Sequence, residues 1–376
     1  MRIAVNTRFL ITNKLEGIGF FTFESMRRIV HSHPEIDFYF LFDRIYSEEF
    51  VFAKNVIPVV LFPPARHTLL WLWWFEISVA HWLNKNNPDL FLSPDGYGCL
   101  HTDVRQVIVM HDLAYEHFSD HIPIIARAYY RYFMPRFAKK AIRVATVSEF
   151  SKSDIVKHYH ILPELIDVVY SGPKEVYKPI DVERKRNVKK KYSDGKEYFL
   201  YVGSIHPRKN IAKLLESFDQ FKKETNSDCK LIIVGRKVWD STNINKIYME
   251  MKHKNDILFA GYVGTQELAE ITASASAMIF VSLFEGFGVP IIEAMNCEVP
   301  VITSNTTSMI EIAGGAAILV NPTSVDEISF ALKTIMSNET LRQTLIEKGI
   351  IQAKKFSWNL TADKLWTCCE KVIMGK

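Results

Sequence analysis

The stretch SLFEGFGVPIIEAM, residues 282–295, directly follows an apolar run at Ala277–Val281 that predicts a buried β-strand. Gly286 and Gly288 allow a tight backbone turn, and Pro290 suits the first turn of a helix, where its missing N–H leaves no hydrogen bond unmade. The pattern therefore predicts a strand, a glycine loop and a helix. The N-terminus of that helix should lie at the carboxyl edge of a parallel sheet, where α/β proteins bind ligands.

Two acids in this stretch, Glu285 and Glu293, are separated by seven residues. A helix N-terminus presents free N–H groups and a partial positive charge, which suits a diphosphate. Glu293, one turn inside the helix, can accept hydrogen bonds from a ribose diol, and Glu285 on the loop is placed to meet a sugar. The alternative is that Glu293 only complements the helix dipole and that Glu285 is a solvated loop acid.

The pattern E-G-F-G-x-P-x-x-E-A-M resembles the E-x7-E motif of the family 4 retaining glycosyltransferases, which have the GT-B fold. The likeness continues through Cys297–Pro322, which is similar to the family's next strand, small-residue loop and short helix. The resemblance implies that Gly286, Phe287, Gly288 and Glu293 bind the nucleotide-sugar donor and that Glu285 acts in catalysis.

A second turn of interest is YVGSIHPRKN, residues 201–210, where a strand ends and a helical pattern begins. Two adjacent cations, Arg208 and Lys209, can clamp a diphosphate and stabilise it as a leaving group. An ordinary solvated basic turn is the alternative. The family has a G-x5-K spacing here, matched by Gly203 and Lys209, but many members have arginine where this chain has Ser204. We therefore expect Gly203 and Ser204 to bind the donor, and Arg208 to supply the second positive charge beside Lys209 in catalysis.

The N-terminal half offers two further turns after apolar strands. Gly17 and Gly19 form a G-x-G loop that lacks the third glycine of a dinucleotide fingerprint, so nicotinamide binding is disfavoured. His111 and Asp112 follow the strand Val107–Met110, and the resemblance implies that they and the glycine loop serve the acceptor, the phosphates and the transferred sugar. A tight turn and a strand-capping histidine are the alternatives. Ser148 or Ser151 is expected mainly to cap a helix.

Short apolar runs alternate with helical patterns at residues 3–5, 107–110, 144–147, 199–202, 231–234 and 277–281, which predicts βα units around parallel sheets. Glycine, prolines and a basic run interrupt this rhythm within 170–195. The expected fold class is α/β of the GT-B type, with two Rossmann-like, doubly wound domains facing a cleft. The predicted domains are 1–175 for the acceptor and 196–356 for the donor, with a C-terminal helix, 357–376, that crosses back to the first domain as in the family.

Composition excludes several classes of protein. A net charge of +4 is too small for a dedicated nucleic-acid binder, and the five cysteines lack metal-ligand or disulfide spacing. The start of the chain lacks the apolar region of a secretory signal, and the most apolar run, LLWLWWF at 69–75, is too short to span a bilayer. We expect a cytoplasmic protein. Aromatic residues in this run and cations within 127–143 also suggest peripheral contact with the inner face of a membrane, against the alternative of core tryptophans and solvated cations.

The function expected from the resemblance is a hexosyltransferase that retains the anomeric configuration and needs no metal and no cofactor. The donor is a nucleotide-sugar, GDP-mannose first because the HPRKN turn resembles mannosyltransferases, and UDP-sugars second. The acceptor is a glycan or a lipid-linked oligosaccharide of a bacterial surface polysaccharide. Two alternatives are a GT-B nucleotide-sugar epimerase, which would release nucleotide without an acceptor, and a catalytically silent sugar-binding subunit of a polysaccharide assembly complex.

Overall fold

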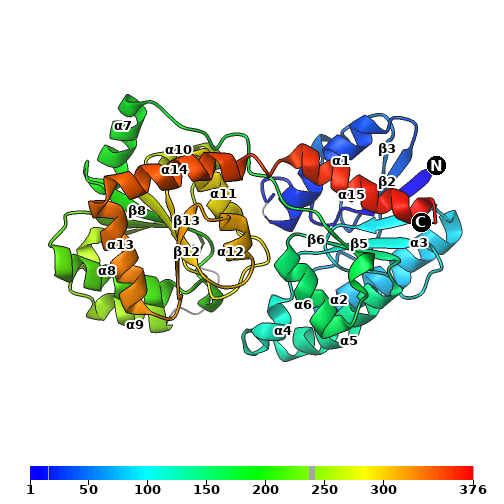
Figure 1. Cartoon of the computed structure of the whole chain (residues 1–376). Coiled ribbons are helices and arrows are strands. Elements are labelled where there is room, and N and C mark those ends of the chain that lie inside the picture. The colour runs from blue at the N-terminus through cyan, green and yellow to red at the C-terminus, as the bar shows by residue number, and fades with distance from the viewer. Residues whose placement is uncertain (16, 237–241, 376) are drawn as a thin grey trace. The chain divides into compact units, whose positions relative to one another are not determined.

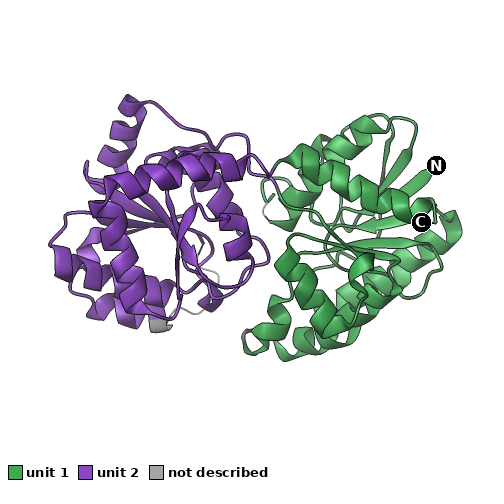
Figure 2. Ribbon diagram, viewed as in Figure 1, with its two compact units in different colours: residues 1–171, 357–376 green, residues 172–356 purple. Residues whose placement is uncertain are grey.

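The computed structural model describes residues 1–15, 17–236 and 242–375. The chain divides into two compact units, coloured separately in Figure 2. Unit 1 comprises Met1–Ser171 and Ser357–Lys376, and unit 2 comprises Gly172–Phe356. Each unit is built around its own parallel sheet.

The sheet of unit 1 has the strand order β3-β2-β1-β4-β5-β6-β7, and all its pairings are parallel. Its strands are β1 (Arg2–Asn6), β2 (Asp37–Phe42), β3 (Val56–Val60), β4 (Leu90–Ser93), β5 (Gln106–Met110), β6 (Arg143–Thr146) and β7 (Ile166–Val168). The central strands β4 and β5 are buried throughout, as expected for a parallel sheet covered on both faces.

The helices of unit 1 connect these strands (Figure 1). They are α1 (Ile18–Ser32), α2 (Thr68–Trp73), the π-helix η2 (Trp74–Val79), α3 (Ala80–Asn86), α4 (Ala114–His117), α5 (Ile124–Lys140), α6 (Glu149–Tyr159) and α15 (Trp358–Ile373), with short 3-10 turns η1 (Glu48–Phe50), η3 (Ser119–His121) and η4 (Pro163–Leu165). Ser148 is the N-cap of α6 and its hydroxyl accepts from the Ser151 N–H at 3.0 Å, so the capping role predicted from sequence is confirmed.

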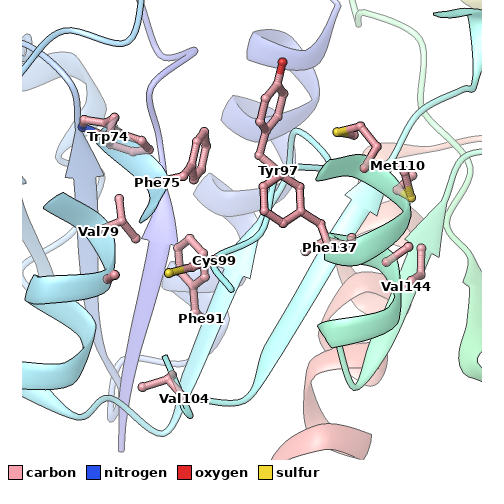
Figure 3. Packing of buried hydrophobic residues seen from close by; sticks show 14 of the residues in the cluster. Trp74, Phe75, Val79, Phe91, Tyr97, Cys99, Val104, Met110, Phe137 and Val144 are labelled. Atoms are coloured by element: carbon pink, nitrogen blue, oxygen red, sulfur yellow. The ribbon is translucent and has the colours of Figure 1, made fainter. Parts of the chain in front are cut away.

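The LLWLWWF run divides between the core and the surface. Trp74 and Phe75 are fully buried, and Phe75 stacks on Tyr97 with ring centroids 5.0 Å apart (Figure 3). Leu69 and Trp73, in contrast, are exposed. The segment is therefore neither wholly buried nor wholly exposed. In the part of the chain that the structure describes, no helix combines the length and apolarity needed to cross a membrane.

The sheet of unit 2 is also all parallel, in the order β10-β9-β8-β11-β12-β13. Its strands are β8 (Tyr198–Val202), β9 (Lys230–Val234), β10 (Ile257–Gly261), β11 (Ala277–Phe280), β12 (Val301–Ser304) and β13 (Ala317–Val320). Its helices are α7 (Val182–Ser193), α8 (Ile211–Thr225), α9 (Thr242–Glu250), α10 (Thr265–Ala273), α11 (Val289–Asn296), α12 (Ser308–Ala313), α13 (Val325–Ser337) and α14 (Glu339–Ala353), with 3-10 turns η5 (Pro207–Lys209) and η6 (Lys254–Asp256).

The sequence left residues 176–195 between the two domains, whereas the structure places them in unit 2. The reason lies in α7. Asp181 caps this helix by accepting from the Arg184 N–H at 2.8 Å, and Val188 is buried on it. Its last turn is bonded to α10, because Lys191 pairs with Glu267 at 2.5 Å and the Tyr192 hydroxyl donates to the same carboxylate. The basic run therefore forms a helix, α7, that packs on the second unit's α10 and β9.

The last helix, α15, belongs to unit 1, where it packs on α1 and on β4 to β7. Thr361 donates to the Tyr170 carbonyl at 2.6 Å, and Lys371 pairs with Asp167 at 2.6 Å. Figure 2 shows the helix in the colour of unit 1. The polypeptide therefore leaves unit 1 once and returns to it once.

Both sheets reverse their strand order after the first strand, between β1 and β4 in unit 1 and between β8 and β11 in unit 2. At such a point the loops leave neighbouring strands in opposite directions, which opens a crevice at the carboxyl ends where doubly wound proteins bind ligands. The fold thus directs attention to the residues that follow β1, β4, β8 and β11.

Candidate active site

The turn after β8 and the loop after β11 lie side by side in unit 2, because these two strands are paired in the sheet. The Leu283 N–H donates to the Arg208 carbonyl at 2.9 Å, which ties the loop to the turn η5. Asn210, buried at the start of α8, donates to the carbonyls of Val281 and Pro322 at 3.0 and 2.7 Å. Two segments that are more than 70 residues apart are thereby held in one fixed arrangement.

The three charged residues predicted from these segments meet in one cluster. Lys209 Nζ lies 2.5 Å from Glu285 Oε1, and Arg208 Nη1 lies 3.1 Å from Glu285 Oε2. Arg208 Nη1 also donates to the Phe284 carbonyl at 2.6 Å. Lys209 Nζ sits 5.4 Å from the centroid of the Phe280 ring, which holds the ammonium in place as well.

Glu285 is buried, and burial disfavours its charged form. The positive charges of Lys209 and Arg208 outweigh that effect, so the pKa of Glu285 lies below its ordinary value. One carboxylate between two cations leaves the cluster with a net charge of +1. The cluster therefore keeps an attraction for an anionic group even though its members are paired with one another.

Glycines allow the backbone to come close together beside this cluster. Gly203 and Gly235 directly follow β8 and β9, both at positive φ, and a Cβ on Gly235 would lie 1.8 Å from the Gly203 carbonyl oxygen. Gly288 has a φ of 101° as the residue that precedes α11. Any side chain at Gly235 would push the two strand ends apart, so the predicted Gly203 turn depends on a second glycine.

Glu293 lies on α11 as predicted, with Pro290 in the first turn of the helix. Its carboxyl group is buried and is hydrogen-bonded by the Tyr177 hydroxyl and by the backbone of Lys174. Burial raises the pKa of Glu293 to about 7, against the opposing effect of the Lys174 charge and of these hydrogen bonds. In this structure Glu293 is thus joined to the segment that enters unit 2.

The remaining residues predicted to bind the donor are held in place mainly by packing and by hydrogen bonds to their backbone carbonyls. Phe287 is buried with its ring edge-to-face on Phe356 at 5.6 Å, so its side chain serves packing. The Ser308 hydroxyl donates to the carbonyls of Glu285 and Phe287 at 2.8 and 3.0 Å and so fixes the loop that contains the buried Gly286. The Ser204 carbonyl accepts from the Tyr201 hydroxyl at 3.4 Å.

In unit 1, His111 follows β5 as predicted, and its Nε2–H donates to the Pro94 carbonyl at 2.8 Å. Its ring meets Phe21 edge-on at 4.9 Å. Burial lowers the pKa of His111, so the imidazole is neutral at pH 7. Asp112 Oδ1 accepts from the Ala114 N–H at 2.9 Å, which ties this carboxylate to the first residue of the short helix α4.

The glycine loop of unit 1 precedes α1. Gly17 has a φ of 48° directly before the helix, with open space where a Cβ would stand. Gly19 is needed for a different reason, since a Cβ there would lie 2.5 Å from the Phe9 carbonyl oxygen. The first glycine sets the turn and the second lets α1 approach the segment that follows β1.

Two family sequence models match this chain one after the other. The family described as Glycosyltransferase Family 4 matches residues 17–173, and the family described as Glycosyl transferases group 1 matches residues 181–352. The chain belongs to the family 4 glycosyltransferases. Membership makes the protein an enzyme that transfers a sugar, as the sequence predicted.

Relatives of this glycosyltransferase include O-antigen chain mannosyltransferase B of Escherichia coli, 29% identical over 74% of this chain and 73% of the relative. O-antigen chain mannosyltransferase RfbU of Salmonella typhimurium is 30% identical over 61% of each chain. The match to serotype-specific mannosyltransferase WbdA of Escherichia coli spans only 32% of that protein, at 25% identity.

Solved structures with the same fold include WaaG, a glycosyltransferase involved in lipopolysaccharide biosynthesis, with a TM-score of 0.75 and 15% identity over the full length of both chains. Sucrose-phosphate synthase from Thermosynechococcus elongatus has a TM-score of 0.78 at 16% identity, also over both full chains. HepE from Anabaena, solved with UDP-glucose, has a TM-score of 0.76 at 16% identity over 99% of this chain and 100% of that one. The glycosyltransferase therefore has the GT-B fold.

Sequence reasoning missed an ion pair in unit 1 of the glycosyltransferase. Arg8 Nε lies 2.5 Å from Asp95 Oδ2 at the carboxyl ends of β1 and β4, and both side chains are buried. The guanidinium also covers the Tyr97 ring at 4.2 Å. The signal available was the position of each residue just after an apolar strand. Tyr177 carried no comparable signal, since it lies in the interrupted stretch at the start of unit 2 and does not directly follow an apolar strand.

Proposed function

We propose that this glycosyltransferase moves mannose from GDP-mannose, with retention of configuration, onto a glycan or lipid-linked acceptor in bacterial surface polysaccharide synthesis. The observation behind the proposal is the cluster of Arg208, Lys209 and Glu285 at the strand-order reversal of unit 2. The names of relatives as O-antigen mannosyltransferases support mannose as the sugar. HepE was solved with UDP-glucose, so a UDP-sugar is the second candidate donor.

In this proposal the two cations bind the diphosphate of the donor. Arg208 and Lys209 meet the oxygens on which charge develops as the bond from the sugar carbon to the diphosphate breaks. Glu285, fixed between them, accepts hydrogen bonds from hydroxyls of the transferred sugar, and Glu293 accepts from the ribose diol. The cluster has to open only enough to admit phosphate oxygens, because its net charge already favours an anion.

The proposed transfer takes place on one face of the sugar. The bond between the anomeric carbon and the diphosphate oxygen breaks, a bond from that carbon to the acceptor oxygen forms, and the acceptor proton passes to the departing phosphate. No step uses a metal or a cofactor, since the cations of the protein meet the charge of the leaving group. For unit 1 we assign the neutral His111 and the loops at Gly17, Gly19 and Asp112 to the acceptor and the transferred sugar.

The test is a calorimetric titration with GDP, UDP, ADP and dTDP in the presence of a chelator. We expect GDP to bind most tightly and its affinity to fall at least about tenfold in Lys209→Ala, which removes a charge-assisted hydrogen bond. Glu293→Ala should lose affinity as well. Lys213→Ala is the matched control, because Lys213 pairs with Glu216 on the same helix. Binding of none of the nucleotides would contradict the transferase assignment, and nucleotide release from the intact donor without an acceptor would indicate an epimerase.

The proposal places the enzyme at the inner face of a membrane. Exposed Leu69, Trp73 and Ile77 lie on α2 and η2, and α2 packs against α5, which carries exposed Tyr132 and Arg136. Apolar and cationic side chains together suit an anionic bilayer surface. We expect salt-sensitive sedimentation with anionic vesicles.

Matched variants distinguish binding through this surface from nonspecific adsorption of the protein to vesicles. Leu69→Ser combined with Trp73→Ser should lower the vesicle-bound fraction, while Phe330→Ser, at an exposed phenylalanine on α13 of unit 2, should leave it unchanged. Absence of sedimentation in the unaltered protein would rule out the membrane contact and leave the transfer reaction unaffected.

A further inference from the structure

A cluster of two histidines and one aspartate lies in unit 1 on elements that the proposed reaction does not use. His117 is the last residue of α4, and Asp154 and His158 lie on α6. Asp154 and His158 are four residues apart, so they share one face of their helix. The face points toward α4, because Asp154 contacts His117 as well as His158.

The distances among the three side chains are short. His117 Nε2 lies 3.0 and 2.9 Å from the two carboxylate oxygens of Asp154, and His158 Nδ1 lies 3.0 Å from Asp154 Oδ1. The two imidazoles meet edge to face with centroids 5.1 Å apart. One nitrogen from each ring and one carboxylate oxygen all lie within 4.8 Å of one another.

Burial differs among the three in a way that suits an ion. The side chain of Asp154 is 6% exposed, whereas those of His117 and His158 are 31% and 28% exposed. The carboxylate is therefore largely removed from water, while the ring edges remain open to it. An ion from solvent can therefore reach the partly exposed imidazoles, which lie beside a poorly solvated negative charge.

A second set of contacts holds α4 on α6 beside the cluster. The hydroxyls of Tyr115 and Tyr159 lie 2.8 Å apart, and the Tyr159 hydroxyl donates to Glu116 Oε1 at 3.0 Å. These bonds join the same two helices without using any of the three cluster residues. The three side chains are thus brought together whether or not an ion is bound.

We propose that His117, Asp154 and His158 form a binding site for a divalent transition metal, with Zn²⁺ the best match. Zinc takes imidazole nitrogens and carboxylate oxygens at about 2.0–2.2 Å in a tetrahedron, which sets neighbouring ligand atoms about 3.3–3.6 Å apart. His117 Nε2 and His158 Nδ1 both lie 3.0 Å from the same oxygen, Asp154 Oδ1, which is already close to that value. Binding through His158 Nδ1 would replace its 3.0 Å contact with the backbone carbonyl of Asp154. Three protein ligands leave the fourth position to water.

The site would stabilise the structure of the segment that follows β5 and would take no part in the chemistry of transfer. α4 begins at Ala114, two residues after Asp112, and the Ser151 hydroxyl of α6 donates to the His111 carbonyl at 3.4 Å. A metal that joins α4 to α6 would therefore fix the segment that follows β5. This role does not depend on the identity of the donor or on the proposed mechanism.

The experiment is a calorimetric titration of the chelator-treated full chain with Zn²⁺, together with metal analysis of the dialysed complex. We expect one Zn²⁺ per chain, at least about tenfold weaker binding in His117→Ala and in His158→Ala, and no comparable binding of Mg²⁺, which prefers oxygen ligands. Co²⁺ in the same site should give the visible absorption of a tetrahedral complex.

The control variant is His101→Ala. His101 Nδ1 lies 2.6 Å from the buried Glu76 carboxylate, so it is a second histidine–carboxylate pair of unit 1 outside the cluster. Zinc affinity that is unchanged in His117→Ala and His158→Ala, or lost equally in His101→Ala, would overturn the proposal. Circular dichroism of each variant separates loss of the site from loss of the fold, and Asp154→Asn, which keeps the shape of the side chain, provides a further check.

Discussion

Glu285 is bonded to the two cations that we assign to the donor diphosphate. This pairing predicts a variant in which GDP affinity and sugar transfer change differently. In Glu285→Gln the cluster has a net charge of +2, so the affinity for GDP should be unchanged or higher. Sugar transfer should fall at least about a hundredfold, because the carboxylate beside the reacting sugar is lost. Calorimetry and a transfer assay on the same preparation measure the two effects. Parallel loss of GDP affinity would mean that Glu285 serves only to position Arg208 and Lys209.

Glu293 makes the stability of unit 2 depend on pH. Its pKa is about 7 in the folded protein and 4.5 ordinarily, so the folded state binds a proton more tightly than the unfolded chain. The contribution of Glu293 to the free energy of unfolding is complete below pH 4.5 and is lost as the pH rises to about 7, a change on the order of 3 kcal/mol. Glu293→Gln should remove this dependence in urea unfolding at pH 5 and pH 8. Glu298→Gln, at an exposed acid that follows α11, should retain it.

The sequence predicted that Glu285, Arg208 and Lys209 would share one edge of the sheet, because each follows an apolar run and the carboxyl ends of parallel strands meet. Their direct pairing could not be predicted, since it depends on the side-chain geometry of two loops. The same holds for Tyr177. Its hydroxyl reaches Glu293 only because the segment after Gly172 folds back onto α11, and no local pattern encodes that path.

At the scale of elements, α15 offers a matched pair of leucines. Leu365 is fully buried, whereas Leu360 on the same helix is 47% exposed. Leu365→Ala should lower the free energy of unfolding of unit 1 by about 2–5 kcal/mol, the cost of a cavity in a packed core. Leu360→Ala should change it by less than about 0.5 kcal/mol. Urea unfolding of both variants measures the difference, and equal effects would mean that α15 is not packed as described.

Six strands could be predicted from their apolar runs, and they correspond to β1, β5, β6, β8, β9 and β11. Others could not. β7 (Ile166–Val168) is only three residues long, and α2 with η2 divides one apolar run between core and surface. The bounds and burial of such elements depend on the neighbours against which they pack, so the periodicity of apolar residues along the chain does not predict them.

At the scale of the whole molecule, each unit has its own sheet and its own core. Thermal unfolding should therefore show two transitions, and a nucleotide that binds unit 2 should raise only one of them. At a hundred times the dissociation constant the gain is about 2.7 kcal/mol. Leu365→Ala assigns the other transition to unit 1, because it should lower that one alone. Differential scanning calorimetry measures both, and a single transition that moves as one in both experiments would contradict independent units.

The return of the chain to unit 1 has a consequence for its biosynthesis. Unit 2 is one continuous stretch, whereas unit 1 needs α15, which the ribosome makes only after all of unit 2. Until then the faces of α1 and of β4 to β7 that α15 covers have no partner, and Phe20 and Phe21 lack the Trp358 ring that lies 5.5 and 6.0 Å from theirs. The half that is translated first is thus the half that is finished last. A nascent chain holds an uncovered apolar face throughout translation of unit 2, which is the state in which chains aggregate or recruit chaperones.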